Sequence, residues 1–401
     1  MGFDEVKQLW WIPVGGFHKV KLVDFKDTRP NIPLHNVSFT GELRPEQHII
    51  QDKMLQNGKL FSGIIQAKCG FGKTFLGSSL IGSYGHTALV LTHTKLLQEQ
   101  WLEHCNKFIE GITIGNIGGG FYRPAPITVG LYLSVANHLE ELREQFSLII
   151  VDEVHRCPAR IFSSVVNGLS AKVKIGLSAT PRRKDGWHEL LPDFFGPNHV
   201  VADNAGATMP IKKVYIIQTP INLKITNPIR DWVRCVSGLS KNENYIKTVA
   251  KWTNAKIAEK RCVLIVNERL EALKQFNSQI PKSRLLIGET PNEDREYILK
   301  NAGIDIDAIL SNKIFYEGVS CNRLDTLALT SPTNNPITLE QILGRIQRLH
   351  PDKQEPEVLD FWYKGFAVQR TQLNRQYWYA KEGISFEIIH DNEFNTRTDT
   401  K

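Results

Sequence analysis

The chain has 401 residues, and its 49 lysines and arginines against 42 aspartates and glutamates give a formal net charge of +7. With 41% hydrophobic and 23% charged residues, the composition excludes a mainly disordered or fibrous protein. Apolar runs such as Leu148–Val151 are far shorter than the roughly 20 residues of a bilayer span, so no membrane segment is expected. The acidic residues near the start do not fit a secretory signal, and we expect a cytoplasmic protein. Six cysteines without metal-ligand spacing predict neither a zinc site nor a disulfide framework.

Two stretches alternate strand-like and helix-like segments, which is the pattern of a parallel sheet flanked by helices. The strand candidates of the first stretch are residues 62–67, 88–92, 127–131, 148–151 and 173–177. Those of the second are residues 263–266, 285–287, 308–310 and 326–329. A small, polar segment at 203–207 predicts a linker. The sequence therefore predicts an α/β fold of two domains, 41–205 and 206–401, behind an N-terminal appendage of residues 1–40 that packs on the first domain.

A glycine-rich loop follows the first strand candidate and precedes a helix-like stretch. It reads Ala67-Lys68-Cys69-Gly70-Phe71-Gly72-Lys73-Thr74. Gly70 and Gly72 let backbone amides turn toward a phosphate, and the start of the following helix adds its positive dipole end. Lys73 can then reach the β- and γ-phosphates of a nucleotide, while the Thr74 hydroxyl can hold Mg²⁺. A chance glycine turn is the alternative.

Two acids end another strand candidate, because Asp152 and Glu153 directly follow Leu148–Val151. Such a strand end places carboxylates at the carboxyl edge of a parallel sheet, where open α/β folds bind ligands. One acid can hold Mg²⁺, and the next can deprotonate an attacking water. The alternative is a charge pair that packs on a helix end. Beside a phosphate loop, the acids predict a domain that binds and hydrolyses a nucleoside triphosphate.

Four motifs, in this order, resemble superfamily 2 helicases of the DExH type. They are the phosphate loop, Asp152-Glu153-Val154-His155, Ser178-Ala179-Thr180 and Gln341-Ile342-Leu343-Gly344-Arg345-Ile346-Gln347-Arg348. Their order and spacing match the family from about residue 43 to residue 348. The resemblance implies two tandem RecA-like domains that use ATP and Mg²⁺. It also implies that ATP closes the two domains on each other and that hydrolysis reopens them.

The resemblance implies a role for each matching residue of the ATP site. Arg44 and Gln47 lie in a segment similar to the adenine-recognition motif of the family, with Gln47 reading the base. Thr74 and Asp152 would hold Mg²⁺, and Glu153 would be the general base. The other implied roles are ATP binding for Gly318, coupling for His155, Ser178, Thr180 and Gln341, and arginine fingers for Arg345 and Arg348. A solvated basic helix face is the alternative for the two arginines.

The implied nucleic-acid contacts are less specific. Short segments after several strand candidates resemble the phosphate-contacting motifs of the family, and an ordinary helix cap or turn is the alternative for each. The candidates are Thr92, His93, Lys95, Ser134, Arg183, Asn267 and Ser320. Ser134 can cap a helix on a phosphate. In the appendage, Trp10, Trp11 and Phe25 can stack on bases or anchor the segment to the first domain.

The chain resembles DEAD-box RNA helicases less than a compact DNA group that contains phage UvsW-type, XPB-type and RecG-like enzymes. A basic segment, Arg182-Arg183-Lys184, follows the Ser178-Ala179-Thr180 motif as it does in that group. The resemblance implies a monomeric helicase or translocase that acts on branched, forked or single-stranded DNA in replication, recombination or repair, in the host cytoplasm if it is a phage protein. A duplex-DNA translocase or an RNA helicase without DNA-unwinding activity is the alternative, and a non-catalytic ATP-dependent clamp is a third hypothesis.

Overall fold

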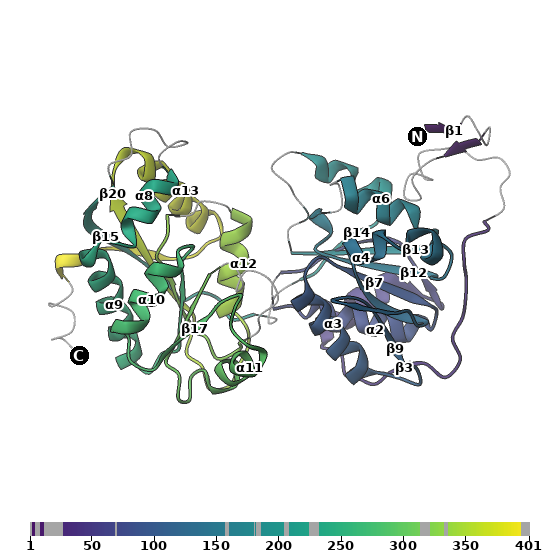
Figure 1. Cartoon of the computed structure of the whole chain (residues 1–401), viewed down its shortest axis with the longest axis horizontal. Helices are drawn as coiled ribbons and strands as arrows, with labels where there is room; N and C mark the ends of the chain where they lie inside the picture. The colour runs from purple at the N-terminus through teal and green to yellow at the C-terminus, as the bar shows by residue number, and fades with distance from the viewer. Residues whose placement is uncertain are drawn as a thin grey trace. The chain divides into compact units, whose positions relative to one another are not determined.

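The computed structural model describes residues 2–4, 9–11, 27–68, 70–156, 160–179, 181, 186–203, 208–223, 232–312, 321–332 and 336–393. The chain divides into two compact units, Met1–Ala205 and Gly206–Lys401, and each is built on one large sheet (Figure 1). Within the described ranges, no helix is both long enough and apolar enough to cross a membrane.

The sheet of the first unit has eight strands, and all neighbours in it are parallel except β10 and β9. In spatial order the strands are β10 (Phe121–Arg123), β9 (Ile114–Gly118), β11 (Ile127–Leu131), β7 (Ala88–Thr92), β12 (Leu148–Asp152), β13 (Val173–Ser178), β6 (Gly63–Gln66) and β14 (His199–Val201). β7, β12 and β13 are buried along their whole length. Both faces of the sheet are therefore covered, which explains why these strands are continuous apolar runs in the sequence.

Seven helices of the described residues belong to this unit: α1 (Pro45–Met54), α2 (Lys73–Tyr84), α3 (Lys95–Phe108), α4 (Tyr132–Ala136), α5 (Leu139–Leu142), α6 (Arg160–Gly168) and α7 (Leu191–Phe195). α2 begins after Gly72, and α3 begins at Thr94, whose hydroxyl accepts a hydrogen bond from the Leu97 backbone N–H. Because α2 and α3 follow β6 and β7, their N-terminal ends lie at the carboxyl edge of the sheet. The short helices are η2 (Val154–Arg156) and η3 (Trp187–Leu190).

Part of the predicted appendage packs on the first unit. The backbone N–H of Leu34 donates to Gly85, and that of Thr87 donates to Ile32. β3 (Ser38–Phe39) pairs with β8 (Ile109–Glu110) after α3. The other small sheets are β1 (Gly2–Asp4) with β2 (Leu9–Trp11), and β4 (Leu55–Gln56) with β5 (Lys59–Leu60). Trp10 and Trp11 lie in β2, whereas Phe25 lies outside the described residues.

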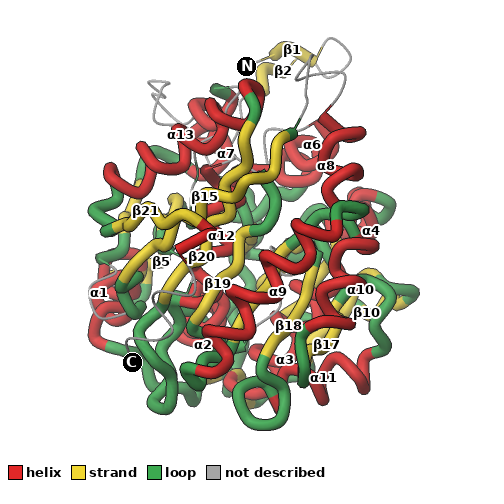
Figure 2. Tube along the Cα trace, turned by 90° about the vertical axis from the view of Figure 1, so that its left-hand side faces the viewer, coloured by secondary structure: helices red, strands yellow, loops and turns green. Residues whose placement is uncertain are grey.

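The sheet of the second unit has seven strands, and all neighbours in it are parallel. In spatial order they are β17 (Ser283–Leu286), β18 (Ala308–Ser311), β16 (Val263–Val266), β19 (Thr326–Leu329), β20 (Glu357–Lys364), β15 (Lys213–Asn222) and β21 (Phe386–His390). Figure 2 shows β19, β20, β15 and β21 side by side. The described helices of this unit are α8 (Trp232–Leu239), α9 (Glu243–Ala258), α10 (Leu270–Gln279), α11 (Asn292–Asn301), α12 (Pro336–Ile346), α13 (Phe366–Lys381) and η5 (Asp391–Glu393).

The predicted α/β fold with two parallel sheets is confirmed. The strand candidates 88–92, 127–131, 263–266 and 326–329 agree with the observed bounds. The candidate at 285–287 is displaced, because β17 ends at Leu286 and begins at Ser283. Six strands of the two large sheets were not among the candidates: β9, β10, β14, β15, β20 and β21. Exposed positions interrupt the apolar run in β10, β14, β15 and β21. β20 is buried along almost its whole length, but the charged residues Glu357 and Asp360 interrupt its apolar run.

Candidate nucleotide site

The chain between β6 and α2 forms the candidate phosphate loop. Gly70 (φ +89°) and Gly72 (φ +85°) have the left-handed backbone conformation that favours glycine. Lys73 is the first residue of α2, and its Nζ donates to the Ala67 carbonyl oxygen at 3.0 Å. The ammonium group is thus held across the loop, within reach of a phosphate bound by the loop amides and the start of α2. Thr74 follows in the first turn of α2 and is half-buried.

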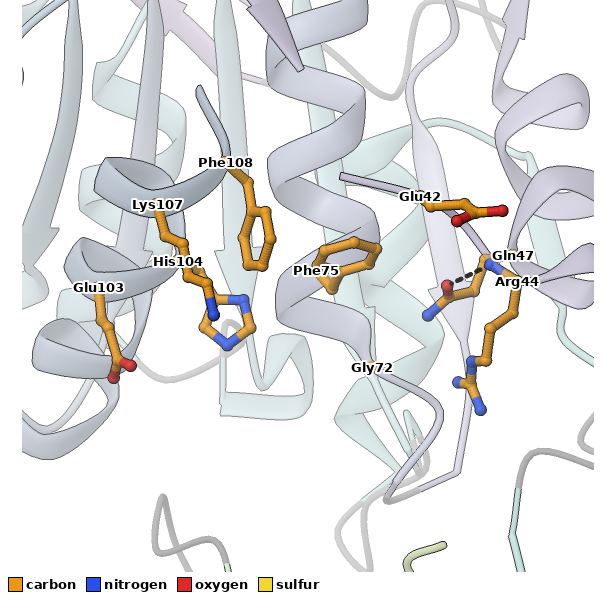
Figure 3. A pocket seen from close by; sticks show the side chains of 9 residues that line it. All are labelled: Glu42, Arg44, Gln47, Gly72, Phe75, Glu103, His104, Lys107 and Phe108. Carbon is orange, nitrogen blue, oxygen red and sulfur yellow. Dashed lines mark hydrogen bonds between the residues drawn. The ribbon is translucent and has the colours of Figure 1, made fainter. Parts of the chain in front are cut away.

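Two side chains from the start of α1 hold the loop in place. Gln47, which is 2% exposed, donates through Nε2 to the Phe71 carbonyl oxygen at 2.8 Å, and Arg44 Nη2 donates to the same oxygen. The Gln47 Oε1 atom accepts a hydrogen bond from the Arg44 backbone N–H at 3.0 Å (Figure 3). A Cβ on Gly72 would lie 2.7 Å from Gln47 Nε2, so α1 and the loop fit closely. The structure therefore gives Gln47 and Arg44 a loop-holding role, and base reading by Gln47 stays a prediction.

A pocket of about 390 Å³ opens beside the phosphate loop. Figure 3 shows Phe75 between the rings of Phe108 and His104 on one side and Gln47 and Arg44 on the other. The ring centroids of Phe75 and Phe108 are 4.9 Å apart, edge to face. Aromatic walls with a few polar groups suit a planar base. The lining residues are Glu42, Arg44, Gln47, Gly72, Phe75, Glu103, His104, Lys107 and Phe108.

Asp152 ends β12 at the carboxyl edge of the sheet, and both of its oxygens are oriented by donors. Its Oδ2 accepts a hydrogen bond from Trp101 Nε1–H at 3.0 Å, and its Oδ1 accepts one from the Glu153 backbone N–H at 2.9 Å. Burial and the charge of Glu153 raise the pKa of Asp152, against the opposing effects of the Trp101 hydrogen bond and the Lys73 charge. The ionised form of Asp152 is therefore stabilised by the neighbouring hydrogen-bond donors and cations.

Glu153 lies next to the phosphate loop in a left-handed backbone conformation, φ +52°. Its Oε2 is 3.3 Å from His155 Nδ1, and the same nitrogen is 3.2 Å from Ser178 Oγ at the end of β13. Burial alone would raise the pKa of Glu153, but the hydrogen bond from His155 and the charges of Lys73, His155 and His93 lower it to about 2. Glu153 is therefore ionised at neutral pH and can accept a proton.

Trp101 is a site residue that the sequence did not reveal. In the sequence, the apolar spacing around Trp101 indicates only the buried face of a helix, because Trp101 and Asp152 are 51 residues apart in the chain. The aromatic wall of Phe75 and Phe108 was missed for the same reason, since no local motif joins α2 to the end of α3.

The residues present fit ATP and Mg²⁺. A magnesium ion that bridges nucleotide phosphates requires few protein ligands, and a carboxylate with a hydroxyl is sufficient. Asp152 and Thr74 supply these groups beside Lys73. Among the described residues, no group of three or more histidine, cysteine, aspartate or glutamate side chains could hold a metal ion without a nucleotide.

The expected arginine fingers lie at the end of α12 in the second unit. Gln341 is half-buried on this helix, and Arg345 is buried in its last turn. The sequence predicts Arg348 on the same helix as Arg345, but α12 ends at Ile346, so Arg348 lies beyond the helix. The two arginines therefore do not share one helix face, and Arg348 is partly exposed in the turn that follows.

The candidate nucleic-acid contacts of the first unit differ in accessibility. Thr92 is fully buried at the end of β7, which contradicts a direct contact. His93 lies near the two acids, since its charge lowers the pKa of both. Lys95 is exposed at the start of α3. Ser134 is not a helix cap, because Leu131 precedes the first residue of α4 and Ser134 lies in its first turn. Lys95 is thus the accessible cation of this group.

Asn267 has an internal role that the sequence did not predict. It is 3% exposed, and its Nδ2 donates to Tyr245 Oη at 2.7 Å and to Thr330 Oγ1 at 2.9 Å. Its Oδ1 accepts a hydrogen bond from the Arg269 backbone N–H at 2.8 Å. The amide is used to fix the end of β16, so a direct nucleic-acid contact is contradicted. Other candidates lie outside the described residues: Thr180, Arg183, Gly318 and Ser320.

Two family comparisons match the two units. The family described as "Type III restriction enzyme, res subunit" matches residues 40–183, and "Helicase conserved C-terminal domain" matches residues 241–350. The chain belongs to the DExH-type helicases of superfamily 2. It is accordingly an ATP-hydrolysing enzyme with two RecA-like units, and the family predicted from the four motifs is confirmed.

Relatives of this helicase come from viruses, archaea and eukaryotes. "Probable helicase D10" of Escherichia phage T5 is 29% identical over 391 residues, which cover 94% of this chain and 84% of that protein. L396 of Acanthamoeba polyphaga mimivirus, which is named as an ATP-dependent RNA helicase, is 23% identical over 414 residues, and these cover 94% of this chain and 78% of that protein. "DNA 3'-5' translocase XPB2" of Sulfurisphaera tokodaii is 32% identical over 245 residues, which cover 58% of this chain and 55% of that protein. Dbp5 of S. cerevisiae, solved with RNA and ADP BeF3, shares the fold with a TM-score of 0.63, 13% identity and coverage of 89% and 96%.

Proposed function

We propose that this helicase is an ATP-driven motor that moves on forked or branched DNA and separates or exchanges its strands. The observation that carries the proposal is the arrangement of Lys73, Asp152 and Glu153 at the carboxyl edge of one sheet, where Glu153 also contacts His155. The choice of DNA is supported by the archaeal relative, which is named a DNA 3'-5' translocase, and we propose the same polarity here.

The proposed hydrolysis uses Glu153 as the general base. Its low pKa keeps the carboxylate ionised at neutral pH. The carboxylate orients the attacking water and takes its proton while the water oxygen bonds to the γ-phosphorus. The bond between the γ-phosphorus and the bridging oxygen breaks, which yields ADP and phosphate. Lys73 and the loop amides stabilise the phosphate charge. Asp152 and Thr74 would hold Mg²⁺, which would supply positive charge to the phosphates.

Coupling to DNA is proposed to pass through His155 and through closure of the two units. His155 connects Glu153 with Ser178, so a proton or charge change at Glu153 alters a contact at the end of β13. Arg345 and Arg348 would complete the site from the second unit when ATP is bound. An arginine finger is typically worth about 10³–10⁵ in rate. Each cycle of closing and opening would then move the DNA-binding surfaces of the units relative to each other.

The test is the rate of ATP hydrolysis with no nucleic acid, single-stranded DNA, duplex DNA, a four-way junction and single-stranded RNA at one fixed salt concentration, because phosphate-driven binding depends on salt. We expect the highest rate with the junction or with a fork. The control is Glu153→Gln, which should bind ATP but lose turnover by about 10³-fold or more. Unchanged turnover of that variant would disprove the role of Glu153.

An RNA helicase is the second candidate, because the mimivirus relative is named as one and covers nearly the whole chain. Strongest stimulation by RNA in the same assay would favour this candidate and reject branched DNA as the substrate. The roles of Lys73, Asp152 and Glu153 in ATP hydrolysis would be the same for either nucleic acid.

A further inference from the structure

A hairpin at one edge of the first sheet exposes two adjacent aromatic rings. β9 and β10 are antiparallel, with Tyr122 opposite Ile117, and the turn between them is formed by Gly119 (φ +63°) and Gly120 (φ +90°). Phe121 is 48% exposed and Tyr122 is 37% exposed. Two large aromatic side chains on a three-residue edge strand add little to the core of the unit. Both rings are therefore accessible to a ligand at this edge of the sheet.

The two rings have different surroundings. The Tyr122 ring stacks on His138 at a centroid distance of 4.0 Å, and His138 lies 3.8 Å from Glu141. Phe121 and Arg123 lie on the other side of the strand, because side chains alternate along it. The Arg123 guanidinium is 5.2 Å from the centroid of the Phe121 ring. Tyr122 is therefore fixed to the unit on an acidic side, whereas Phe121 combines an exposed ring with a cation.

The hairpin is attached to the start of α3, close to Lys95. A Cβ on Gly119 would lie 3.5 Å from Lys95 Cε, so the turn contacts this side chain. Gln98 on the same helix donates through Nε2 to Asn116 Oδ1 at 2.8 Å and to the Ile117 carbonyl oxygen at 3.0 Å. The Lys95 side chain is 64% exposed. Its Nζ lies 3.7 Å from Glu99 Oε1 in an exposed ion pair, where the charge of Lys95 is accessible to a ligand. The hairpin thus presents an aromatic ring beside the cation that the sequence predicts as a phosphate contact.

We infer that Phe121 is a base-stacking residue, on which one base of the bound nucleic-acid strand lies while Lys95 and Arg123 face its phosphates. The inference rests on the proposed function, because it requires a nucleic-acid strand at the start of α3. An aromatic platform tolerates any base, since every base has a π-face, and it suits a motor that must bind all sequences. Tyr122, packed on His138, holds the hairpin in position. This contact requires bases, whereas a lysine contact requires only phosphates.

The test compares a single-stranded oligonucleotide that contains 2-aminopurine with an abasic oligonucleotide of the same length. With Phe121→Ala, we expect binding of the base-containing strand to weaken about 5- to 100-fold and the quenching of 2-aminopurine to be lost. Phe121→Tyr should restore both. Binding of the abasic strand should be the same for wild type and Phe121→Ala, whereas Lys95→Ala should weaken binding of both strands. The rate of ATP hydrolysis by Phe121→Ala in the absence of nucleic acid should equal that of wild type.

Val201→Ala is the matched control, because Val201 is 57% exposed on β14, the opposite edge strand of the same sheet. If wild type binds the base-containing strand and Phe121→Ala binds it equally well, the inference is wrong and the proposed function stands. If wild type binds neither DNA nor RNA, both fail. If sedimentation shows a wild-type dimer that Phe121→Ala abolishes without a change in strand binding, the hairpin is an interface between copies and the inference is rejected.

Discussion

Trp101 orients Asp152, and the indole N–H is the only part of its side chain that can do so. Trp101→Phe should keep most of the packing but remove the hydrogen bond at 3.0 Å. A hydrogen bond to a charged group contributes about 1.5–3 kcal/mol, so we expect kcat to fall about tenfold or more and the Mg²⁺ requirement to rise. Because this bond lowers the pKa of Asp152, the acid limb of the pH–rate profile should shift to higher pH.

The matched control for this prediction is Trp252→Phe. Trp252 Nε1 donates to Asp391 Oδ1 at 2.8 Å in the second unit, so the same chemical group is lost at a site without nucleotide-binding residues. Its kcat, Mg²⁺ requirement and pH profile should match those of wild type. If both variants lose activity equally, the effect of Trp101→Phe is a general loss of stability.

Asp152 and Glu153 should affect stability with opposite dependence on pH. The folded pKa of Asp152 is raised, so its charge disfavours folding once the pH rises through that value. The folded pKa of Glu153 is lowered to about 2. The ionised side chain therefore stabilises the fold fully above its unfolded pKa, and this stabilisation is lost as the pH falls toward the folded pKa. As the pH rises above about 4, the Tm of Asp152→Asn relative to wild type should therefore rise. That of Glu153→Gln should fall as the pH rises to about 5 and stay level above it, and equal slopes for the two variants would contradict the assignment.

Gly72 tests the close fit between the phosphate loop and α1. Gly72→Ala places a Cβ 2.7 Å from Gln47 Nε2, whereas Gly58→Ala has the same kind of backbone, φ +72°, with no atom within 4 Å. Each should lose about 1–2 kcal/mol of stability from the left-handed conformation. Gly72→Ala alone should also weaken ATP binding, because Gln47 must move away from the loop. Equal ATP affinity of the two variants, by titration calorimetry, would exclude Gln47 as a loop-holding residue.

At the scale of elements, α13 is attached to β20 by a buried ion pair. Arg375 donates to both oxygens of Asp360, at 2.5 and 3.1 Å, and Tyr379 donates to the same carboxylate at 3.0 Å. Asp360→Asn should leave a buried guanidinium without its counter-charge and destabilise the protein by about 3–5 kcal/mol in a denaturant titration. Glu243→Gln removes the exposed pair with Lys247 and should change stability by less than about 0.5 kcal/mol. Similar losses of stability in the two variants would show that burial does not determine how much these ion pairs contribute.

The strands that could be predicted from the sequence are those in which a run of apolar residues is followed directly by polar side chains. β7, β12 and β16 are buried on both faces, so their residues are uniformly apolar and their ends are marked by polar side chains. β15 alternates buried and half-exposed residues and has no motif at its end, so it was missed. Motifs indicated the candidate residues of the ATP site, but the contacts of Trp101 and Asn267 depend on chain segments that only the fold brings together.

At the scale of the whole molecule, the candidate ATP-site residues are divided between the two units. Lys73, Asp152 and Glu153 belong to the first, and Arg345 and Arg348 belong to the second. Under the proposed function, the two sets act on the same nucleotide when the units approach, so bound ATP is expected to favour a more compact state. A ligand shifts such an equilibrium by its differential affinity for the two states, so the proposal requires that the arginines contribute to ATP binding in the compact state alone.

Small-angle X-ray scattering can test this closure directly. Glu153→Gln is expected to bind ATP without turnover, so with ATP and DNA its radius of gyration should be smaller than that of the ligand-free protein. Adding Arg345→Ala should abolish most of the decrease, because the compact state then lacks its contact with the γ-phosphate, while ATP should still bind to the first unit. Lys73→Ala should show no decrease, because ATP is not held. Full compaction with Arg345→Ala would show that closure does not depend on this arginine and would assign it a structural role in α12.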